Sequence, residues 1–187
     1  MKKKSDEKLK IIPLGGLEQI GMNITAFECQ DSIVLVDCGL AFPEDDMLGV
    51  DLVIPDVTYL LENADKVKGL CITHGHEDHI GAIPYILKQI NMPIYATKLT
   101  NGLIENKLKE HGMLRTVKRK VVKYGQSINL GCFRIEFIKT NHSIQDAAAL
   151  ALFSPAGIVV HTGDFKVDYT PVFGDAIDLQ RFGEIGK

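Results

Sequence analysis

The residues at positions 74 to 79 read His-Gly-His-Glu-Asp-His, which places three of the chain's six histidines beside a carboxylate. They follow directly on the apolar run 67–72, whose composition is typical of a short buried strand. In an extended chain, residues i and i+2 project to the same side. The side chains of His74 and His76 can therefore bind one cation together, and we interpret the segment as a metal-binding loop at the end of a strand.

The same segment provides for a second ion. If a helix begins at Asp78, the side chains of Asp78 and His79 point away from the first two histidines and toward a neighbouring metal position. The competing interpretation is a polar loop whose histidines only form hydrogen bonds. The spacing H-x-H-x-D-H is rare by chance in a chain of this composition, which favours the metal site.

One loop supplies too few ligands for such a site, and two later residues stand in similar places. His142 follows the alternating pattern 133–138, and Asp164 follows the short apolar run 158–163, which a glycine interrupts. Each stands where a predicted strand gives way to a loop, and we predict that both are metal ligands. His161, inside the second run, is expected to be a hydrogen-bonded structural histidine.

Together these residues carry a family resemblance. Asp37, the 74–79 segment, His142 and Asp164 resemble the first four signature motifs of the metallo-β-lactamase superfamily. Six segments more narrowly resemble the amino-terminal part of the ribonuclease J family of bacterial β-CASP ribonucleases: residues 13–16, 42–45, 54–56, 72–81, 141–144 and 163–166. The resemblance extends from about residue 8 to residue 187.

The resemblance implies a mixed α/β (α+β) fold. This is the αββα sandwich of the superfamily, of which the chain holds the amino-terminal portion only. Residues 1–7 are expected to form a disordered tail. Residues 8–187 are expected to form the amino-terminal part of a metallo-β-lactamase domain, truncated before the β-CASP insert. In the family a later histidine completes the second metal position, and it lies outside these 187 residues.

The resemblance also implies a chemistry for the full-length protein: metal-dependent hydrolysis of RNA phosphodiesters, exonucleolytic, endonucleolytic or both, in RNA processing and decay. The cofactor implied is a pair of Zn²⁺ ions, with Mn²⁺ as the alternative. Zinc is favoured over iron because His76 stands where the di-iron branch carries a glutamate. The implied ligands are His74, His76 and His142 for the first ion, Asp78 and His79 for the second, and Asp164 between them.

Two carboxylates are expected to act in catalysis. Asp78 is expected to orient the attacking water. Asp37, at the end of the apolar run 33–36, either orients a ligand or metal-bound water, or simply caps a turn. Partners implied for the complete protein are RNA and either a second copy of the chain or an RNA-decay complex.

Two competing functions stay open. The same ligands serve superfamily hydrolases that act on thioesters or lactams. Alternatively, the isolated chain is a metal-binding but catalytically incomplete module. Half a sandwich leaves apolar surface uncovered, so we expect aggregation, association or low stability of the 187-residue chain alone.

The net charge of −3 does not indicate a nucleic-acid binder, so contact with a polyanion must come from a local patch or from the metals. Residues 107–123 contain seven lysines and arginines and one glutamate, a balance of 7 − 1 = +6. This basic segment either steers RNA toward the site or is an ordinary solvated surface.

Four scattered cysteines without C-x-x-C spacing indicate reduced thiols rather than disulfides or a thiolate metal site. No apolar stretch reaches the length of a membrane span, and no signal-type segment follows the first residues. We expect a cytoplasmic protein without membrane contact.

Hydrophobic periodicity predicts short strands and two helices. Strands are expected at residues 9–13, 23–29, 33–37, 67–72, 93–96, 117–123, 132–139, 147–153 and 158–161, and helices at 83–90 and 99–111.

Overall fold

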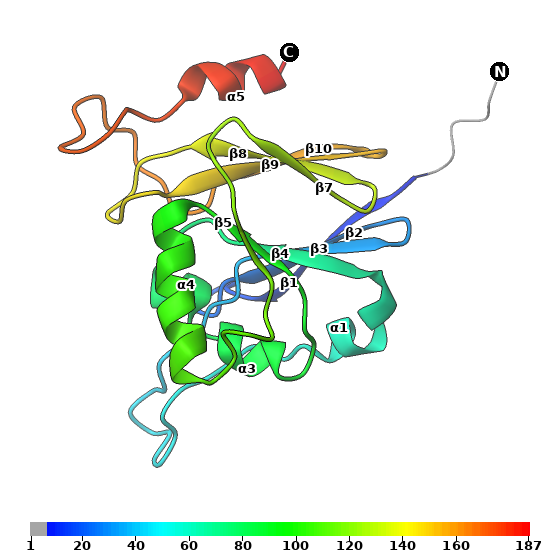
Figure 1. The fold of residues 1–187 in the computed structure, drawn as a ribbon, viewed down its shortest axis with the longest axis vertical. Helices are drawn as coiled ribbons and strands as arrows, with labels where there is room; N and C mark the ends of the chain where they lie inside the picture. The colour runs from blue at the N-terminus through cyan, green and yellow to red at the C-terminus, as the bar shows by residue number, and fades with distance from the viewer. Residues whose placement is uncertain (1–6) are drawn as a thin grey trace.

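Two β-sheets packed face to face form the centre of the protein, as seen in a computed structural model that describes residues 7–187 (Figure 1). The first sheet has the order β1 (Leu9–Gly15), β2 (Ile24–Cys29), β3 (Ser32–Val36), β4 (Val67–Cys71), β5 (Ile94–Ala96) and β6 (Arg119–Val121). The second has the order β10 (Gly157–His161), β9 (Ala148–Ser154), β8 (Phe133–Lys139) and β7 (Ser127–Leu130).

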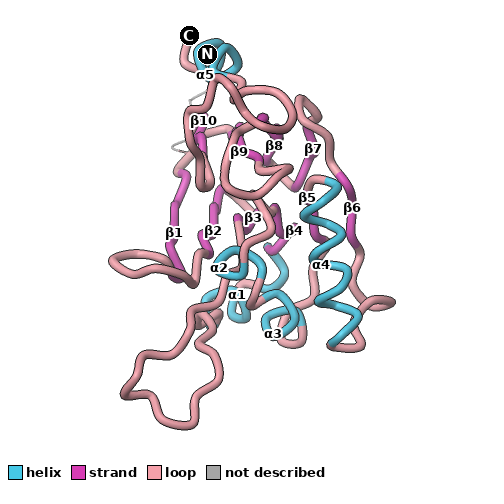
Figure 2. The backbone as a smooth tube through the Cα atoms, turned by 90° about the vertical axis from the view of Figure 1, so that its left-hand side faces the viewer, coloured by secondary structure: helices cyan, strands magenta, loops and turns pink. Residues whose placement is uncertain are grey.

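Helices cover the outer face of each sheet (Figure 2). The first sheet carries α1 (Thr58–Glu62), the 3₁₀ turn η1 (Ala64–Lys66), α2 (Glu77–Ile80), α3 (Ile83–Leu87) and α4 (Lys98–Glu110), and the second carries α5 (Leu179–Ile185). Leu60, Ile83 and Ile104 belong to the core between the helices and the first sheet. Phe27, Phe133 and Phe137 belong to the core between the sheets. Phe182 and Ile185 of α5 pack on the far side, against Ala149 and its neighbours. The layers are therefore helix, sheet, sheet and helix, and the expected αββα fold class is confirmed.

The direction of the strands determines where the site forms in the first sheet. Strands β1 to β3 form an antiparallel meander, whereas β3 to β6 pair in parallel. Parallel neighbours need crossover connections, which contain the helices α1 to α4. The carboxyl ends of β3 and β4 consequently lie at the same edge, and each continues into a loop that carries predicted site residues.

The second sheet brings two more loops to that edge. Strands β8 and β10 both run antiparallel to β9, so their carboxyl ends also lie together. An isolated bridge joins Asn141 to Lys166, just beyond the ends of these two strands. The amide of Ala148 donates a 2.9 Å hydrogen bond to the carbonyl oxygen of Thr73, which joins the second sheet to the loop after β4. Four strand ends from two sheets thus meet at one place.

Most expected elements are present, with ends shifted by a few residues. The helix expected at 83–90 is α3, which ends at Leu87. Of the strand expected at 117–123, only Arg119–Val121 (β6) is a strand. Helices α1 and α5 and strand β7 were not expected. The tail expected at 1–7 falls mostly outside the described residues; Glu7 lies inside them and accepts a hydrogen bond from Gln30. Within residues 7–187, no helix has the length and apolar character needed to cross a membrane.

Candidate metal centre

Three histidine nitrogens converge at the shared edge of the sheets. Nε2 of His74 lies 3.0 Å from Nδ1 of His76, and Nε2 of His142 lies 3.2 Å from the same Nδ1. In a tetrahedral zinc site with Zn–N bonds of about 2.0–2.1 Å, neighbouring nitrogens lie roughly 3.3 Å apart. The spacing of these donor atoms therefore fits one tetrahedral cation.

A buried hydrogen-bond chain sets the tautomer of His74. The hydroxyl of Thr73 lies 2.8 Å from Oδ2 of Asp37 and 3.0 Å from Nδ1 of His74. A hydroxyl has one hydrogen, and an ionised carboxylate can only accept, so Thr73 donates to Asp37 and accepts from Nδ1–H of His74. This leaves the lone pair of Nε2 of His74 directed at the other two imidazoles, as a metal ligand requires.

A second group of donors forms around His79. Its Nε2 lies 3.5 Å from Oδ1 of Asp164 and 3.4 Å from Oδ2 of Asp78. Its Nδ1 lies 2.8 Å from Oδ2 of Asp37. Because Asp37 accepts from Nδ1–H, the lone pair is on Nε2, which faces these two carboxylates and also lies 3.2 Å from Nδ2 of Asn23.

Asp164 lies between the two groups. Oδ1 of Asp164 faces Nε2 of His79 at 3.5 Å, and Oδ2 faces Nε2 of His142 at 3.7 Å. One carboxylate thus presents an oxygen to each group. Its side chain is 47% exposed, so the space between the groups opens to solvent.

The two groups are not equally rich in donors. His74 lies within reach of both the His76–His142 group and the His79–Asp164 group. An imidazole nitrogen has a single lone pair, so His74 can serve one ion only. The second position then has His79, Asp78 and Asp164, with room beside it: a cavity of about 200 Å³ is lined by His79, Asp164, Gly15, Gly16 and His161, among others.

The electrostatics keep the first group ready for a cation. Burial lowers the pKa of His74 to about 3, with a smaller effect from His79, and burial also lowers the pKa of His142. Both imidazoles are therefore neutral at physiological pH, the state that binds metal. Burial acts to lower the pKa of His79, but the hydrogen bond to Asp37 together with the negative charges of Asp37, Asp78 and Asp164 raises it overall.

The backbone conformation at Asp37 and Gly39 lets the loop after β3 lie close to α2. Asp37 has a φ of 62°, in the left-handed region that aspartate tolerates better than most residues. Two residues later, a Cβ added to Gly39 would lie 1.6 Å from the carbonyl oxygen of Asp78. Glycine at this position therefore allows the loop after β3 to touch the first turn of α2, where the ligand helix begins.

Sequence reasoning did not single out two residues that hold the site. The first is Thr73, whose hydroxyl contacts Asp37 and His74 as described above. Asn23, just before β2, donates from Nδ2 to the carbonyl oxygen of Asp78 at 3.1 Å and to Oδ2 of Asp78 at 3.3 Å. Thr73 is a polar residue at the end of an apolar run, a signal that could have found it. Asn23 contacts Asp78, which is 55 residues later in the sequence, and no local sequence pattern indicates this contact.

The remaining histidines and the paired residues of the basic segment either lie away from the centre or already have partners. In the basic segment 107–123, Lys107 binds Glu77 at 2.8 Å and Arg119 binds Glu105 at 2.8 Å. His111 ends α4 and packs edge-on against Tyr85. His161 accepts a 3.2 Å hydrogen bond from the amide of Gly163, a structural contact next to the second group.

The sequence matches a family profile described as "Metallo-beta-lactamase superfamily" over residues 23–179. The chain belongs to the metallo-beta-lactamase superfamily. Among curated proteins, it is 51% identical over 183 residues to "Ribonuclease J" of Synechocystis, covering 97% of the chain and 29% of the relative. It is 48% identical over 177 residues to "Ribonuclease J 1" of Streptococcus pyogenes, covering 95% of the chain and 31% of that relative. It is 41% identical over 187 residues to "Ribonuclease J2" of Bacillus subtilis, covering 100% of the chain and 34% of that relative.

The resemblance to ribonuclease J is thereby confirmed, and the chain spans about a third of the length of these relatives. Two solved structures share the superfamily fold. A protein of unknown function from Enterococcus faecalis aligns with a TM-score of 0.68 at 18% identity, covering 86% of this chain and 44% of that one. The metallo-beta-lactamase fold protein YhfI from Bacillus subtilis aligns with a TM-score of 0.55 at 21% identity, covering 83% and 62%.

Proposed function

We propose that the complete protein is a metal-dependent ribonuclease and that residues 7–187 supply most of its metal centre. The support for RNA as substrate is the similarity to proteins named ribonuclease J. The support for a metal-dependent hydrolysis is the converging set of histidines and carboxylates. The cleavage proposed is exonucleolytic, endonucleolytic or both.

The single observation that carries a two-metal site is the position of Asp164. Its two oxygens face His79 and His142, which belong to different groups, and a carboxylate placed in this way suits a bridging ligand. In the proposed arrangement His74, His76 and His142 hold the first ion. His79 and Asp78 hold the second, and Asp164 joins them.

The donor set favours zinc, with manganese as the alternative. Imidazole nitrogens suit zinc, and the 3.0–3.2 Å spacing within the first group fits a tetrahedral ion. When bound, the pair of cations lowers the pKa of a water molecule and offsets the negative charge that builds up on the phosphate during attack.

Asp78 and Asp37 have different roles in this proposal. Asp78 is 34% exposed and lies beside His79, where its free oxygen can accept a proton from the attacking water. Asn23 holds this carboxylate in place from the other side. Asp37 is buried behind His79 and does not reach the substrate, so it is a positioning residue.

The test uses the longer protein that contains this chain. We expect His76→Ala and Asp164→Ala to reduce metal-dependent RNA cleavage by about a thousandfold or more, because each removes a ligand of the centre. His111→Ala and Asp31→Ala are matched controls, and both should cleave RNA as the wild type does. Wild-type-like cleavage by the first two variants, or hydrolysis of thioesters or lactams in place of RNA, would contradict the proposal.

A second candidate applies to the 187-residue chain by itself: a metal-binding module that is catalytically incomplete. The observation that favours it is the second position, which has three protein donors, His79, Asp164 and Asp78, once His74 is assigned to the first. Measuring zinc content and RNA cleavage of the short chain beside the longer protein separates the two. One bound ion without cleavage is the result expected of the module.

We propose that the complete protein is cytoplasmic, which fits the four free cysteines of this chain. As further partners we propose a second copy of the chain or an RNA-decay complex.

A further inference from the structure

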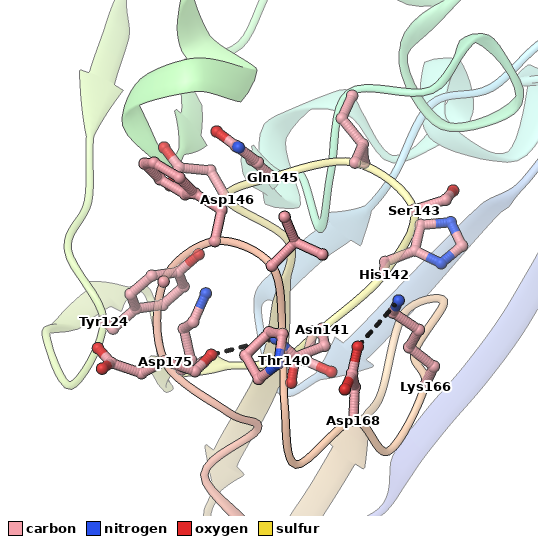
Figure 3. Close-up of a pocket in the computed structure, with 16 residues that line it drawn as sticks. Tyr124, Thr140, Asn141, His142, Ser143, Gln145, Asp146, Lys166, Asp168 and Asp175 are labelled. Carbon is pink, nitrogen blue, oxygen red and sulfur yellow. Dashed lines mark hydrogen bonds and ion pairs between the residues drawn. The ribbon is translucent and has the colours of Figure 1, made fainter.

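A cavity of about 440 Å³ has His142 in its lining (Figure 3). It is enclosed by the loop after β8, the loop after β10 and Tyr124. In Figure 3, Tyr124 and His142 stand at opposite ends of the ring of side chains. A volume of this size lies within the ~300–1,000 Å³ typical of small-ligand sites. A group bound here would touch the metal centre at one end.

The charges around the cavity do not favour a phosphate. Two lysines, Lys139 and Lys166, line it together with three aspartates, 146, 168 and 175. Lys166 is already paired with Asp168 at 3.2 Å. The balance is 2 − 3 = −1 from these residues, so a polyanionic group is repelled rather than held. The cavity therefore suits an uncharged part of a substrate whose phosphate lies at the metals.

Its wall combines apolar and aromatic side chains with unsatisfied polar atoms. Phe173 is 71% exposed and lines both this cavity and the groove that continues toward α4. A nucleobase of any kind can stack on an exposed aromatic ring.

The polar atoms lie in the first residues of the loop after β8. Thr140 and Asn141 are 1% and 7% exposed. Within residues 7–187, Oγ1 of Thr140 and Oδ1 of Asn141 have no hydrogen-bond partner, although Nδ2 of Asn141 donates to the carbonyl oxygen of Asp175. Buried polar atoms without a partner are costly, so this part of the cavity wall is not fully satisfied by the described residues.

Lys139 adds a donor that is still available. Its Nζ lies 5.0 Å from the centre of the Tyr124 ring and forms no ion pair within residues 7–187. A nucleoside matches this combination, because it presents a flat ring for stacking and hydroxyl, amino and carbonyl groups for hydrogen bonds.

We propose that this cavity binds the nucleoside next to the phosphodiester that is cut, with its base stacked on Phe173. The inference rests on the proposed ribonuclease function and adds a substrate subsite to it. It makes Phe173 a substrate-binding residue that acts on affinity and not on the chemical step.

The experiment measures cleavage kinetics of the longer protein on single-stranded RNA, with the wild type and Phe173→Ala. Loss of one base stack raises KM by about tenfold and leaves kcat within about twofold. A set of RNAs with one abasic residue, moved stepwise through the positions around the cut, then locates the base. At one position the abasic RNA should raise KM for the wild type but not further for Phe173→Ala.

Two controls make the outcome specific. Phe173→Trp keeps an aromatic surface and should restore KM. Tyr169→Ala removes a similarly exposed ring, 75% exposed, that lies in the same segment but does not line the cavity, and should leave KM unchanged.

Each alternative result is decisive. If the wild type cleaves RNA but Phe173→Ala keeps its KM on every substrate, the subsite is refuted and the proposed function stands. A lower melting temperature of Phe173→Ala with unchanged KM identifies the cavity as a packing surface for another part of the longer protein. If the wild type does not cleave RNA, both proposals fail.

Discussion

Oδ2 of Asp37 lies 2.8 Å from Nδ1 of His79, and both side chains are buried. The same carboxylate accepts hydrogen bonds from the amide and the hydroxyl of Thr73, each at 2.8 Å, and this hydroxyl in turn contacts Nδ1 of His74. One buried carboxylate therefore orients a histidine in each donor group, directly in one case and through a hydroxyl in the other.

Exchanging Asp37 for asparagine should weaken metal binding about 10- to 100-fold, the usual effect of losing an outer hydrogen-bond partner of a ligand. The amide and hydroxyl of Thr73 demand an acceptor at Oδ1, which turns the new NH₂ group toward His79. Its Nδ1 must then accept, so Nε2 carries the proton and cannot bind a cation. Isothermal titration with zinc measures the change, with the exposed Asp31→Asn as control. Equal affinities would show that Asp37 only caps the turn.

Thr73→Val should selectively impair the first group. It removes the hydroxyl that holds Nδ1–H of His74 while keeping the shape of the side chain, so one imidazole loses its fixed tautomer. We expect zinc affinity to fall about tenfold or more and Thr73→Ser to restore it. Competition with a chromogenic chelator gives both constants. Equal zinc affinities of the valine and serine variants would show that the hydroxyl does not contribute to metal binding.

Much of the site could be predicted from sequence because its ligands stand at strand ends. A polar residue that directly follows an apolar run marks a strand's carboxyl end, and parallel strands collect those ends at one edge. The 74–79 segment, His142 and Asp164 were found in this way, and the structure brings them together. The family resemblance supplied the layered fold.

What sequence could not supply were relations between distant residues. The contact of Asn23 with Asp78 exists because Gly39 lets two loops touch, and no local pattern contains that information. Strand β7 has weak alternation, and only its last residue is buried. Helix α5 contains a glycine, although Asp178 caps its start by accepting from the amide of Arg181. Asp178 was an available signal for that helix.

Glu28 should make stability depend on pH below its ordinary pKa of 4.5. Burial acts to raise the pKa of Glu28, but hydrogen bonds from Tyr59, Lys10 and Lys66 outweigh it and lower the pKa to about 2. A lowered folded-state pKa contributes stability above pH 4.5 that is lost as the pH falls toward about 2.

Urea unfolding of the metal-free protein between these pH values measures this contribution. We expect no more than about 3 kcal/mol, reduced by solvent screening of the exposed Lys10. Glu28→Gln should lack this part of the pH dependence, since glutamine does not titrate there. Parallel stability curves for wild type and variant would mean that the ion pairs contribute nothing.

The 187-residue chain should self-associate through β10. This strand is at the edge of the second sheet, and its side chains Ile158 and Val160, 49% and 37% exposed, lie on the same side. An unpaired strand edge beside exposed apolar side chains is a template for association. Sedimentation at about 10–100 µM should detect oligomers that the double variant Ile158→Thr/Val160→Thr reduces. A monomer across this range would contradict the expectation.

The central claim is that six side chains from three strand ends hold two cations. Anomalous diffraction at the zinc absorption edge, from crystals of the longer protein grown with zinc, tests it most directly. Two peaks are predicted, one bonded to His74, His76 and His142 and one to His79 and Asp78, with Asp164 contacting both. A single peak held by His74, His79 and Asp164, or no peak within bonding distance of these residues, would contradict the claim.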